Sequence, residues 1–467
     1  MWLLDTFLPV IGITFLVVIC GSYLLIHLAA VIRMRKQVTG RAWEPVYDVL
    51  EDPLVPDIAV FVPAYNEETV IVESVRSFLN LNYPNFEIVV VNDGSTDGTL
   101  AVLDEEFSLT ELEVPPMLSD APCEPVHGVY QSNAVENLRV VDKENGGKGD
   151  AHNAGIWLTD SELFCIVDAD TIIQPTCLAN MVRPFLEHPD EMVAVGGPIR
   201  VANGSTIDEG LMTRPKLPSN LLAGLQQVEY IRAFYSGRLG LDQLRSLILI
   251  SGAFGLFRTD LVREMGGYDE DSIVEDIEFT VRLHRHLIDR DRPYRVGYLL
   301  HPLVYTQVPE DIATLANQRR RWFRGLVETM VKHYDAMFDR QYGRIGMFAL
   351  PFFCIGEGIG RILEAIGYLL LPVMLAVGVV SLKPILFVFV GTMFFGVLLT
   401  WISIFTEVWS SGQYGHPRQV LKLMGLAVVE FIGYRQWRTF VAVQGLFEYV
   451  RGENSWGEME RSTLNTD

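Results

Sequence analysis

The feature that most constrains this 467-residue chain is an uncharged apolar run close to its N-terminus. The run, Phe7–Ile32, exceeds the roughly 20 residues that a helix needs to cross a bilayer. Asp5 precedes it, and Arg33 and Lys36 follow it, whereas a cleaved signal peptide would begin with a basic region. Because basic residues favour the cytoplasmic side, we expect the N-terminus outside and the chain after the span in the cytoplasm.

Two further regions have the hydrophobicity of membrane segments, and a third is more weakly apolar. Ile345–Val380 is long for one span and carries three charged residues, so we expect an interfacial or broken helix there, followed by a true span at Pro384–Phe405. Gln419–Val450 holds charges that are costly in lipid and is expected to be interfacial or pore-lining. The predicted division is an N-terminal transmembrane helix (1–36), a cytoplasmic domain (53–332), interfacial and transmembrane helices (333–450) and a short cytoplasmic tail (451–467).

Composition agrees with a protein that is part membrane-embedded and part soluble. The chain is 49% hydrophobic and 20% charged, which is too apolar for an ordinary soluble enzyme and too charged for a pure membrane bundle. Its formal net charge of -21 argues against nucleic-acid binding. The five cysteines show no CxxC spacing and no neighbouring histidine cluster, so free buried thiols are expected rather than a zinc site.

Between the apolar regions, short β-branched runs alternate with helical patterns, which is typical of a soluble α/β domain. The sequence predicts four strands, at Ile58–Pro63, Glu87–Val91, Leu138–Val141 and Leu163–Val167. A helix should open at Tyr65–Glu68. In such folds ligands bind beyond the carboxyl ends of parallel strands. The lack of G-x-G-x-x-G and P-loop motifs disfavours a dinucleotide enzyme and a P-loop ATPase.

Two polar turns follow predicted strands and could bind a ligand. The turn NDGSTDGT begins at Asn92, and Asp and Gly are also the ordinary residues of turns, so a purely structural role remains open. The turn NGGKG contains Lys148, whose charge lies beside two glycines and could approach a phosphate. A surface turn without a ligand is the alternative for this second motif.

Two acidic motifs could supply catalytic carboxylates. Asp168 and Asp170 follow a buried strand, and residues two apart on a strand project to one face, so both suit a divalent cation that also binds phosphate. The alternative is a solvated pair of acids. Asp276 lies in the first turn of a predicted helix, where acidic residues also simply complement the helix dipole.

The stretch QRRRW precedes the second apolar region. On a helix, Gln318, Arg321 and Trp322 share one face, which could offer hydrogen-bond donors and a flat apolar ring to a ligand. Arg319 and Arg320 point elsewhere and are expected to meet anionic headgroups at the cytoplasmic surface. A tryptophan packed in the core beneath an interfacial helix is the alternative to a ring that contacts a ligand.

The order of motifs along the chain is more specific than any one of them. VPAYNEE, NDGSTDGT, NGGKG, DAD, SGAFGLFR, ED and QRRRW resemble, in this order, the motifs of membrane-embedded processive family 2 glycosyltransferases, which include cellulose, chitin, hyaluronan and poly-N-acetylglucosamine synthases. The resemblance implies a GT-A (Rossmann-like) α/β fold flanked by membrane helices. Motif support covers about Asp57 to Gly325, and small residues in SGAFGL would let an acceptor sugar approach the backbone.

The resemblance also implies roles for single residues. The nucleoside and diphosphate of a nucleotide sugar would be bound by Ala64, Tyr65, Glu67, Asp93, Lys148 and Asp168. Asp170 would hold Mg²⁺ or Mn²⁺, and Asp276 would be the general base that takes the proton of the acceptor hydroxyl. Gln318, Arg321 and Trp322 complete the expected catalytic set.

The expected function is inverting transfer from a nucleotide sugar, expected to be a UDP-sugar, onto a growing β-linked polysaccharide at the cytoplasmic face of the cell membrane. Coupled export, lipid contacts and an accessory or export subunit are further expectations. Transfer of one sugar to a lipid-linked acceptor or glycolipid is the first alternative. A non-catalytic membrane scaffold that binds sugar nucleotides is an alternative of another class.

Overall fold

The computed structural model describes residues 8–39, 55–208, 210–301, 304–411, 414 and 416–452. Three parts of the predicted organisation lie outside the described residues: the start of the N-terminal run with Asp5 and Phe7, the start of the soluble domain at 53–54, and most of the tail, 453–467.

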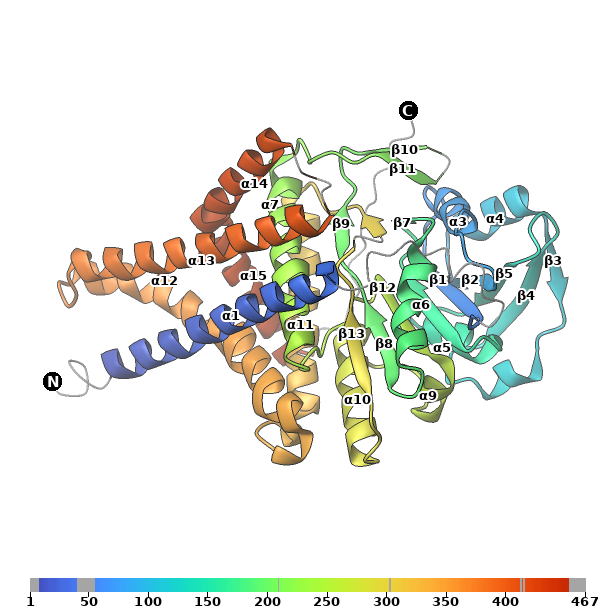
Figure 1. Ribbon diagram of the computed structural model, residues 1–467, viewed down its shortest axis with the longest axis horizontal. Coiled ribbons are helices and arrows are strands. Elements are labelled where there is room, and N and C mark those ends of the chain that lie inside the picture. The colour runs from blue at the N-terminus through green and yellow to red at the C-terminus, as the bar shows by residue number, and fades with distance from the viewer. Residues whose placement is uncertain are drawn as a thin grey trace.

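A mixed sheet forms the centre of the α/β domain (Figure 1). Among the described residues, nine strands pair in the order β13-β8-β12-β6-β1-β2-β5-β4-β3. The bounds are β1 (Ile58–Ala64), β2 (Phe86–Asp93), β3 (Leu109–Leu112), β4 (Val126–Ser132), β5 (Leu138–Lys143), β6 (Leu163–Val167), β8 (Met192–Gly196), β12 (Phe254–Arg258) and β13 (Arg295–Tyr298). The four predicted strands are β1, β2, β5 and β6, and they pair in parallel. Their carboxyl ends therefore meet at one edge of the sheet.

Helices flank this sheet (Figure 1). They are α3 (Ile71–Leu79), α4 (Thr99–Phe107), α5 (Lys148–Leu158), α6 (Cys177–Glu187), α9 (Thr259–Glu264) and α10 (Glu275–Asp289). The helix predicted to open at Tyr65–Glu68 begins instead at Ile71. Asn66 has a left-handed φ of 56°, and its Oδ1 accepts a hydrogen bond from the Thr96 amide at 2.8 Å. This contact joins the loops that follow β1 and β2.

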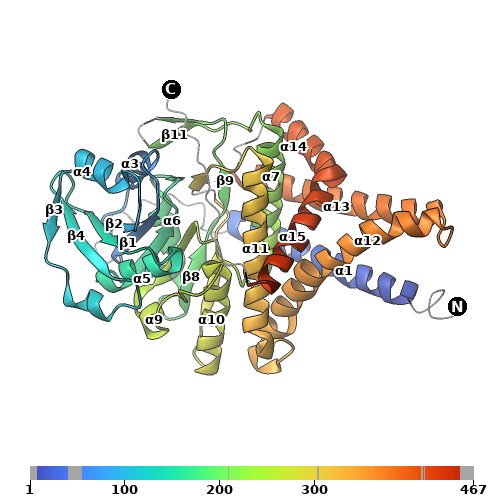
Figure 2. The ribbon, with the colours of Figure 1, turned by 180° about the vertical axis from the view of Figure 1, so that it is seen from behind.

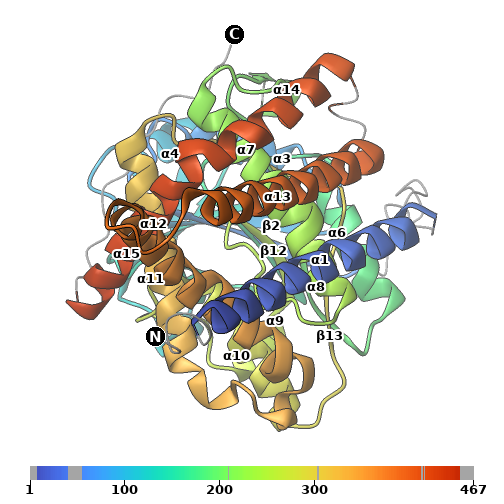
Figure 3. The ribbon, with the colours of Figure 1, turned by 90° about the vertical axis from the view of Figure 1, so that its left-hand side faces the viewer.

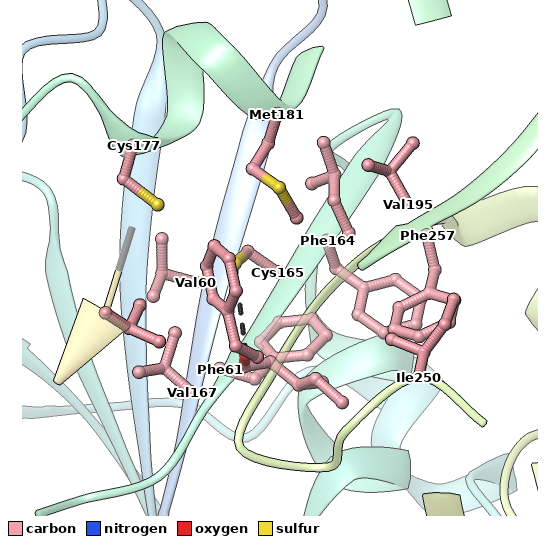
Figure 4. Close-up of a cluster of buried hydrophobic side chains, with 14 of the residues drawn as sticks. Val60, Phe61, Phe164, Cys165, Val167, Cys177, Met181, Val195, Ile250 and Phe257 are labelled. Carbon is pink, nitrogen blue, oxygen red and sulfur yellow. Dashed lines mark hydrogen bonds between the residues drawn. The ribbon is translucent and has the colours of Figure 1, made fainter. Parts of the chain in front are cut away.

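Aromatic side chains fill the core across adjacent strands (Figure 4). The Phe61 and Phe164 rings stack with centroids 5.2 Å apart, and Phe164 and Phe257 stack at 5.5 Å. All five cysteines are free, as predicted, but only Cys165 and Cys177, which lie in this cluster, are fully buried, while Cys20, Cys123 and Cys354 are partly exposed.

Two small sheets lie beside the large one. They contain β7 (Thr171–Ile173), β9 (Ile199–Val201) and β14 (Val304–Thr306), and the hairpin of β10 (Thr206–Asp208) and β11 (Leu211–Arg214). In the first of them Thr306 pairs with Thr171, which brings β14 beside the turn that follows β6. Single 3-10 turns occur at Pro116–Asp120, Tyr334–Ala336 and Arg340–Tyr342.

The remaining elements form the helical part of the protein. They are α1 (Leu8–Thr39), α7 (Leu221–Arg232), α8 (Leu239–Gln243), α11 (Ile312–Lys332), α12 (Gly360–Ala376), α13 (Leu382–Ser411), α14 (Pro417–Val429) and α15 (Arg435–Val450), with π-helical turns at Ala233–Arg238, Ile345–Ala349, Phe352–Ile359 and Glu430–Tyr434. In Figures 1 and 2, α7 and α11 stand next to the sheet, while α1, α12 and α13 extend away from it on the same side.

Within the described part of the chain, three helices are long and apolar enough to cross a membrane: Thr14–Thr39, Ile345–Ala376 and Leu382–Ser410. The second is continuous through its π-helical turns and reaches spanning length, while its expected interfacial position stays a prediction. Many large apolar side chains on α12 and α13 are exposed, among them Leu369 and Phe387. Such a surface suits contact with lipid.

Candidate active site

One cavity of about 2210 Å³ connects the carboxyl edge of the sheet with the space between the membrane helices. Seven predicted site residues line it: Lys148, Asp168, Asp170, Asp276, Gln318, Arg321 and Trp322. Its other end is lined by residues of α1, α12 and α13, such as Phe15, Leu371 and Phe389. In Figure 3 these three helices are seen from the end that points away from the sheet. The structure therefore joins the predicted chemistry to the membrane segment.

The DAD turn lies directly beyond β6. Asp168 and Asp170 both line the cavity, as their spacing predicts. Asp170 Oδ1 accepts a hydrogen bond from Thr306 Oγ1 at 3.3 Å, so β14 helps to orient this carboxylate. The Asp168 side chain is 31% exposed.

Lys148 connects the DAD turn with the ED motif. It opens α5 after Gly147, whose φ of 88° is a conformation that favours glycine. Its Nζ lies 2.5 Å from Asp168 Oδ1 and 3.4 Å from Glu275 Oε1. Burial lowers the pKa of Lys148, but these carboxylates outweigh burial and hold that pKa above its ordinary value. Lys148 is therefore positively charged, and an incoming phosphate could replace these carboxylates as its partner.

Asp276 lies in the first turn of α10 and faces the cavity. Its Oδ2 accepts a hydrogen bond from the Gly252 amide at 2.9 Å. Burial, followed by the negative charge of Glu275, raises the pKa of Asp276 to about 6, although the Gly252 amide and the cations Lys148 and Arg238 oppose the shift. A carboxylate with a pKa near the working pH is suited to general-base catalysis.

This pKa gives the first testable prediction. A general base acts in its ionised form, so the rate should be constant above the pKa of Asp276 and fall about tenfold per pH unit below it. We expect kcat/KM for sugar transfer to fall as the pH drops through about 6. A pH profile of initial rates, with nucleotide binding measured at each pH, checks this. A profile that stays flat down to pH ~4.5 would contradict it.

The SGAFGL segment contacts the site residues through its backbone rather than through side chains. Gly252 donates its amide to Asp276 and accepts a hydrogen bond from Lys148 Nζ at 2.9 Å through its carbonyl oxygen. A Cβ at this position would lie 2.6 Å from Glu275 Oε1. Gly252 is therefore tightly packed, and its backbone holds the ED motif and Lys148 together, while the approach of an acceptor sugar to this segment stays a prediction.

The QRRRW segment lies on α11, which begins at the N-cap Asp311. Gln318, Arg321 and Trp322 line the cavity, and the Trp322 side chain is 37% exposed. Gln318 Oε1 is buried and has no hydrogen-bond partner among the described residues. The helical face that the spacing predicts is therefore present, while its part in catalysis stays a prediction.

The expected contact with headgroups is wrong for Arg319, which is buried, whereas Arg320 keeps a partly exposed side chain and its contact with headgroups stays a prediction. Arg319 is buried, pairs with Glu229 at 3.1 Å, and lies over the Trp322 ring at 4.2 Å from its centroid. Arg320 pairs with Glu448 at 3.0 Å. These partners come from α7 and α15, elements far away in the sequence, and so the spacing within QRRRW could not reveal them. The guanidinium of Arg319 instead packs against one face of the Trp322 ring.

Asp93 has a structural role that the sequence did not reveal. Its carboxylate accepts hydrogen bonds from Lys143 Nζ at 2.8 Å and from the amides of Gly146 and Gly147 at 3.0 and 2.8 Å. Burial raises the pKa of Asp93, while these donors oppose the shift. Asp93 thus fixes the turn that places Lys148.

The other predicted nucleoside-binding residues lie at the same edge. Ala64 ends β1 beside Asn92, Tyr65 is 49% exposed, and the amide of buried Glu67 donates to Thr99 Oγ1 at 2.9 Å. In the described part of the chain, neither these three residues nor Asp93 lines the large cavity. Their contact with a nucleoside stays a prediction.

A network of ion pairs lies in the membrane half of the cavity. Glu229 forms ion pairs with Arg319 and, at 2.9 Å, with Arg438, and two nitrogens of Arg232 donate short hydrogen bonds to Glu430. The charges in Gln419–Val450 predict a segment that is interfacial or lines a pore, and Glu430 and Arg438 do line the cavity, but the sequence did not reveal their partners.

The carboxylates present fit a divalent cation that arrives with a diphosphate. Among the residues that the structure describes, no group of three or more His, Cys, Asp or Glu could hold a metal by itself. Mg²⁺ is commonly bound by one or two carboxylates, with waters and substrate phosphates as the other ligands. Asp168 and Asp170, open to one cavity, are such a pair.

Sequence patterns of known families match two parts of the α/β domain. The pattern of a family described as "Glycosyltransferase like family 2" matches residues 123–325, and that of "Glycosyl transferase family 2" matches residues 59–114. Among solved structures, a mannosyltransferase from Pyrobaculum calidifontis in complex with GDP-Man and Mn²⁺ has a TM-score of 0.52 and 17% identity, covering 95% of this chain and 99% of that one. This likeness shows a shared fold.

Curated relatives share more of the sequence. Poly-β-1,6-N-acetyl-D-glucosamine synthase of Staphylococcus epidermidis is 28% identical over 285 residues, which are 61% of this chain and 58% of that protein. The corresponding synthase of Staphylococcus aureus (strain COL) is 27% identical over 278 residues, 59% of this chain and 56% of that protein. The chain thus matches less than two thirds of the length of either relative. Residues 59–114 and 123–325 thus match family 2 glycosyltransferases, the domain that contains them has a GT-A-like fold, and the chain is similar to polysaccharide synthases of this family.

Proposed function

We propose that the protein transfers sugar units from a nucleotide sugar to the end of a growing β-linked polysaccharide, with inversion at the anomeric carbon. The observation that carries the proposal is the single cavity that contains Asp168, Asp170 and Asp276 and continues between the membrane helices. The likeness to poly-β-1,6-N-acetyl-D-glucosamine synthases supports extension of a polysaccharide.

In this mechanism Asp276 takes the proton of the acceptor hydroxyl as its oxygen attacks the anomeric carbon. Inversion requires attack from the side opposite the departing diphosphate, so one carboxylate suffices as base and a covalent nucleophile is unnecessary. The Gly252 amide, donating to Oδ2 at 2.9 Å, orients Asp276. The raised pKa of Asp276 makes it a better proton acceptor than an ordinary aspartate once it is ionised.

The leaving diphosphate would be held on the opposite side of the sugar. Lys148 would exchange its contact with Asp168 for phosphate oxygens, and Asp168 would then be free for a cation. We propose that Asp168 and Asp170 hold Mg²⁺ or Mn²⁺, which, when bound, would neutralise charge on the leaving group. The Mn²⁺ in the mannosyltransferase complex supports this choice of ion.

The acceptor end would lie against α11. Trp322 offers an exposed ring for a sugar, and buried Gln318 Oε1 can accept a hydrogen bond from a sugar hydroxyl. The chain would then enter the part of the cavity between α1, α12 and α13. We therefore propose a multi-pass protein of the cell membrane, with the catalytic domain in the cytoplasm and the product exported through its own helices, alone or with an accessory subunit.

The donor is proposed to be a UDP-sugar, with UDP-N-acetylglucosamine the first to test because of the named product of the relatives. A second candidate function is transfer of one sugar to a lipid-linked acceptor. Apolar residues of the cavity wall, such as Leu371 and Phe389, favour it because they could hold a lipid tail.

One experiment separates these functions. The purified protein in detergent and lipid is given single nucleotide sugars with Mg²⁺ or Mn²⁺, with GDP-mannose as one of the donors, and nucleotide release and product mass are measured. The proposal expects release from one donor together with a product of high mass. A discrete one-sugar product favours the second candidate, and absence of release from every donor would refute both.

A further inference from the structure

Arg238 differs from the other cations of the cavity. Most of those cations are paired with carboxylates, in the pairs Lys148–Asp168, Arg232–Glu430, Arg361–Glu357, Arg435–Glu364 and Arg438–Glu229. Arg238 lines the same cavity, yet no carboxylate among the described residues forms an ion pair with it. Its one hydrogen bond within this set joins Nε to the Leu249 carbonyl oxygen at 3.4 Å. Its terminal nitrogens are therefore available to a ligand in the cavity.

The position of the guanidinium is fixed by its neighbours. Arg238 ends the π-helical turn Ala233–Arg238, which joins α7 to α8, and such turns are frequent at functional sites. Its Cζ lies 4.2 Å from the centroid of the Phe234 ring, and Phe234 in turn packs edge-on against Tyr230 at 5.5 Å. Tyr230 and Phe234 also line the cavity. One helical face thus presents two aromatic rings and a cation.

A short backbone segment connects Arg238 to the predicted base. The Leu249 carbonyl oxygen accepts a hydrogen bond from Arg238 Nε, and three residues later the Gly252 amide donates a hydrogen bond to Asp276. The Gly252 carbonyl oxygen accepts a hydrogen bond from Lys148 Nζ. Lys148, Asp276 and Arg238 are therefore arranged along one wall of the cavity. Since the π-helical turn that carries Arg238 packs on α1 and α13, Arg238 lies toward the membrane side of this wall.

We propose that Arg238 is a positioning residue for the acceptor: its terminal nitrogens donate hydrogen bonds to oxygen atoms of the sugar whose hydroxyl Asp276 deprotonates. Tyr230 and Phe234 would form the aromatic wall beside that sugar. The planar guanidinium suits two neighbouring sugar oxygens, and aromatic rings suit the apolar face of a pyranose. This inference rests on the proposed function, because it needs Asp276 to act as the base.

The charge of Arg238 also lowers the pKa of Asp276. Removing that charge should raise the pKa of the base and move the acidic limb of the rate profile to higher pH. A residue that only supported the helix would not move this limb. The acceptor KM and the position of the acidic limb therefore report on the two contributions of Arg238.

The test uses the full-length protein and an oligosaccharide of the sugar that the wild-type enzyme polymerises. In Arg238→Gln we expect the acceptor KM to rise at least about tenfold, the acidic limb to move upward, and donor affinity to stay within about twofold. Arg238→Lys should restore the position of the acidic limb but not the KM, because it keeps the charge and loses the planar fork. The matched control is Arg245→Gln, because Arg245 is an exposed arginine just after α8, the helix that follows Arg238.

Defined outcomes overturn the inference. An unchanged acceptor KM with an unmoved acidic limb in Arg238→Gln refutes it, as does an equal loss of donor affinity, which would indicate a structural role. Absence of nucleotide release by the wild-type enzyme would refute the proposed function itself. Wild-type polymerisation with a normal acceptor KM in Arg238→Gln would refute the role of Arg238 alone.

Discussion

Asp276→Asn is expected to abolish sugar transfer, with a loss of about 10²–10⁴-fold in kcat. The amide cannot take a proton from the acceptor hydroxyl, yet its oxygen can still accept the hydrogen bond from the Gly252 amide. It also removes a buried negative charge beside Glu275, so the fold should be kept. The measurement is the initial rate of sugar transfer at pH 8, where wild-type Asp276 is ionised.

The matched control is Asp271→Asn, five positions earlier at an exposed residue. It removes the same charge from the same region and should retain the wild-type rate. Binding of the nucleotide to Asp276→Asn should persist, which separates loss of the base from unfolding. Full activity of Asp276→Asn would remove Asp276 from the role of base.

Asp170→Asn is expected to lower the rate about a hundredfold and to raise the concentration of Mg²⁺ or Mn²⁺ needed for half-maximal activity. The amide keeps the shape of the side chain and its hydrogen bond with Thr306, but it is a much weaker cation ligand than a carboxylate. Titrating the cation against both the rate and nucleotide affinity measures the effect.

Asp160→Asn, at an exposed residue before β6, is the control for this change. The two site variants should also differ from each other. Asp276→Asn should keep the wild-type cation dependence of nucleotide binding, whereas Asp170→Asn should lose it. If both variants showed the same cation dependence as wild type, Asp170 would not be a cation ligand.

The fold and the seven cavity residues were largely predictable because they depend on local signals. Strands β1, β2, β5 and β6 are short apolar runs, and parallel strands bring the residues that follow them to one edge. The positions of Asp168, Asp170 and Lys148 at that edge follow from the order of strands and turns alone. Likewise, helical spacing is enough to place Gln318, Arg321 and Trp322 on one face.

The contacts that the sequence could not predict join distant segments. Arg319 pairs with Glu229 of α7, and Asp93 holds the amides of Gly146 and Gly147. Neither pairing has a spacing that periodicity can detect. The helix Ile345–Ala376 gives another example: Glu364 pairs with Arg435 of α15, a contact that the sequence could not show and that lowers the cost of this charge in lipid.

The central claim is that the transfer site and the membrane passage form one cavity, so that synthesis and export belong to one protein. The most direct test is the protein in sealed liposomes with its catalytic domain facing outward and the donor sugar supplied outside. We predict a product of high mass that a glycoside hydrolase added outside degrades only after the vesicles are opened with detergent. A product fully degraded without detergent, or a single sugar on a lipid, would contradict the claim.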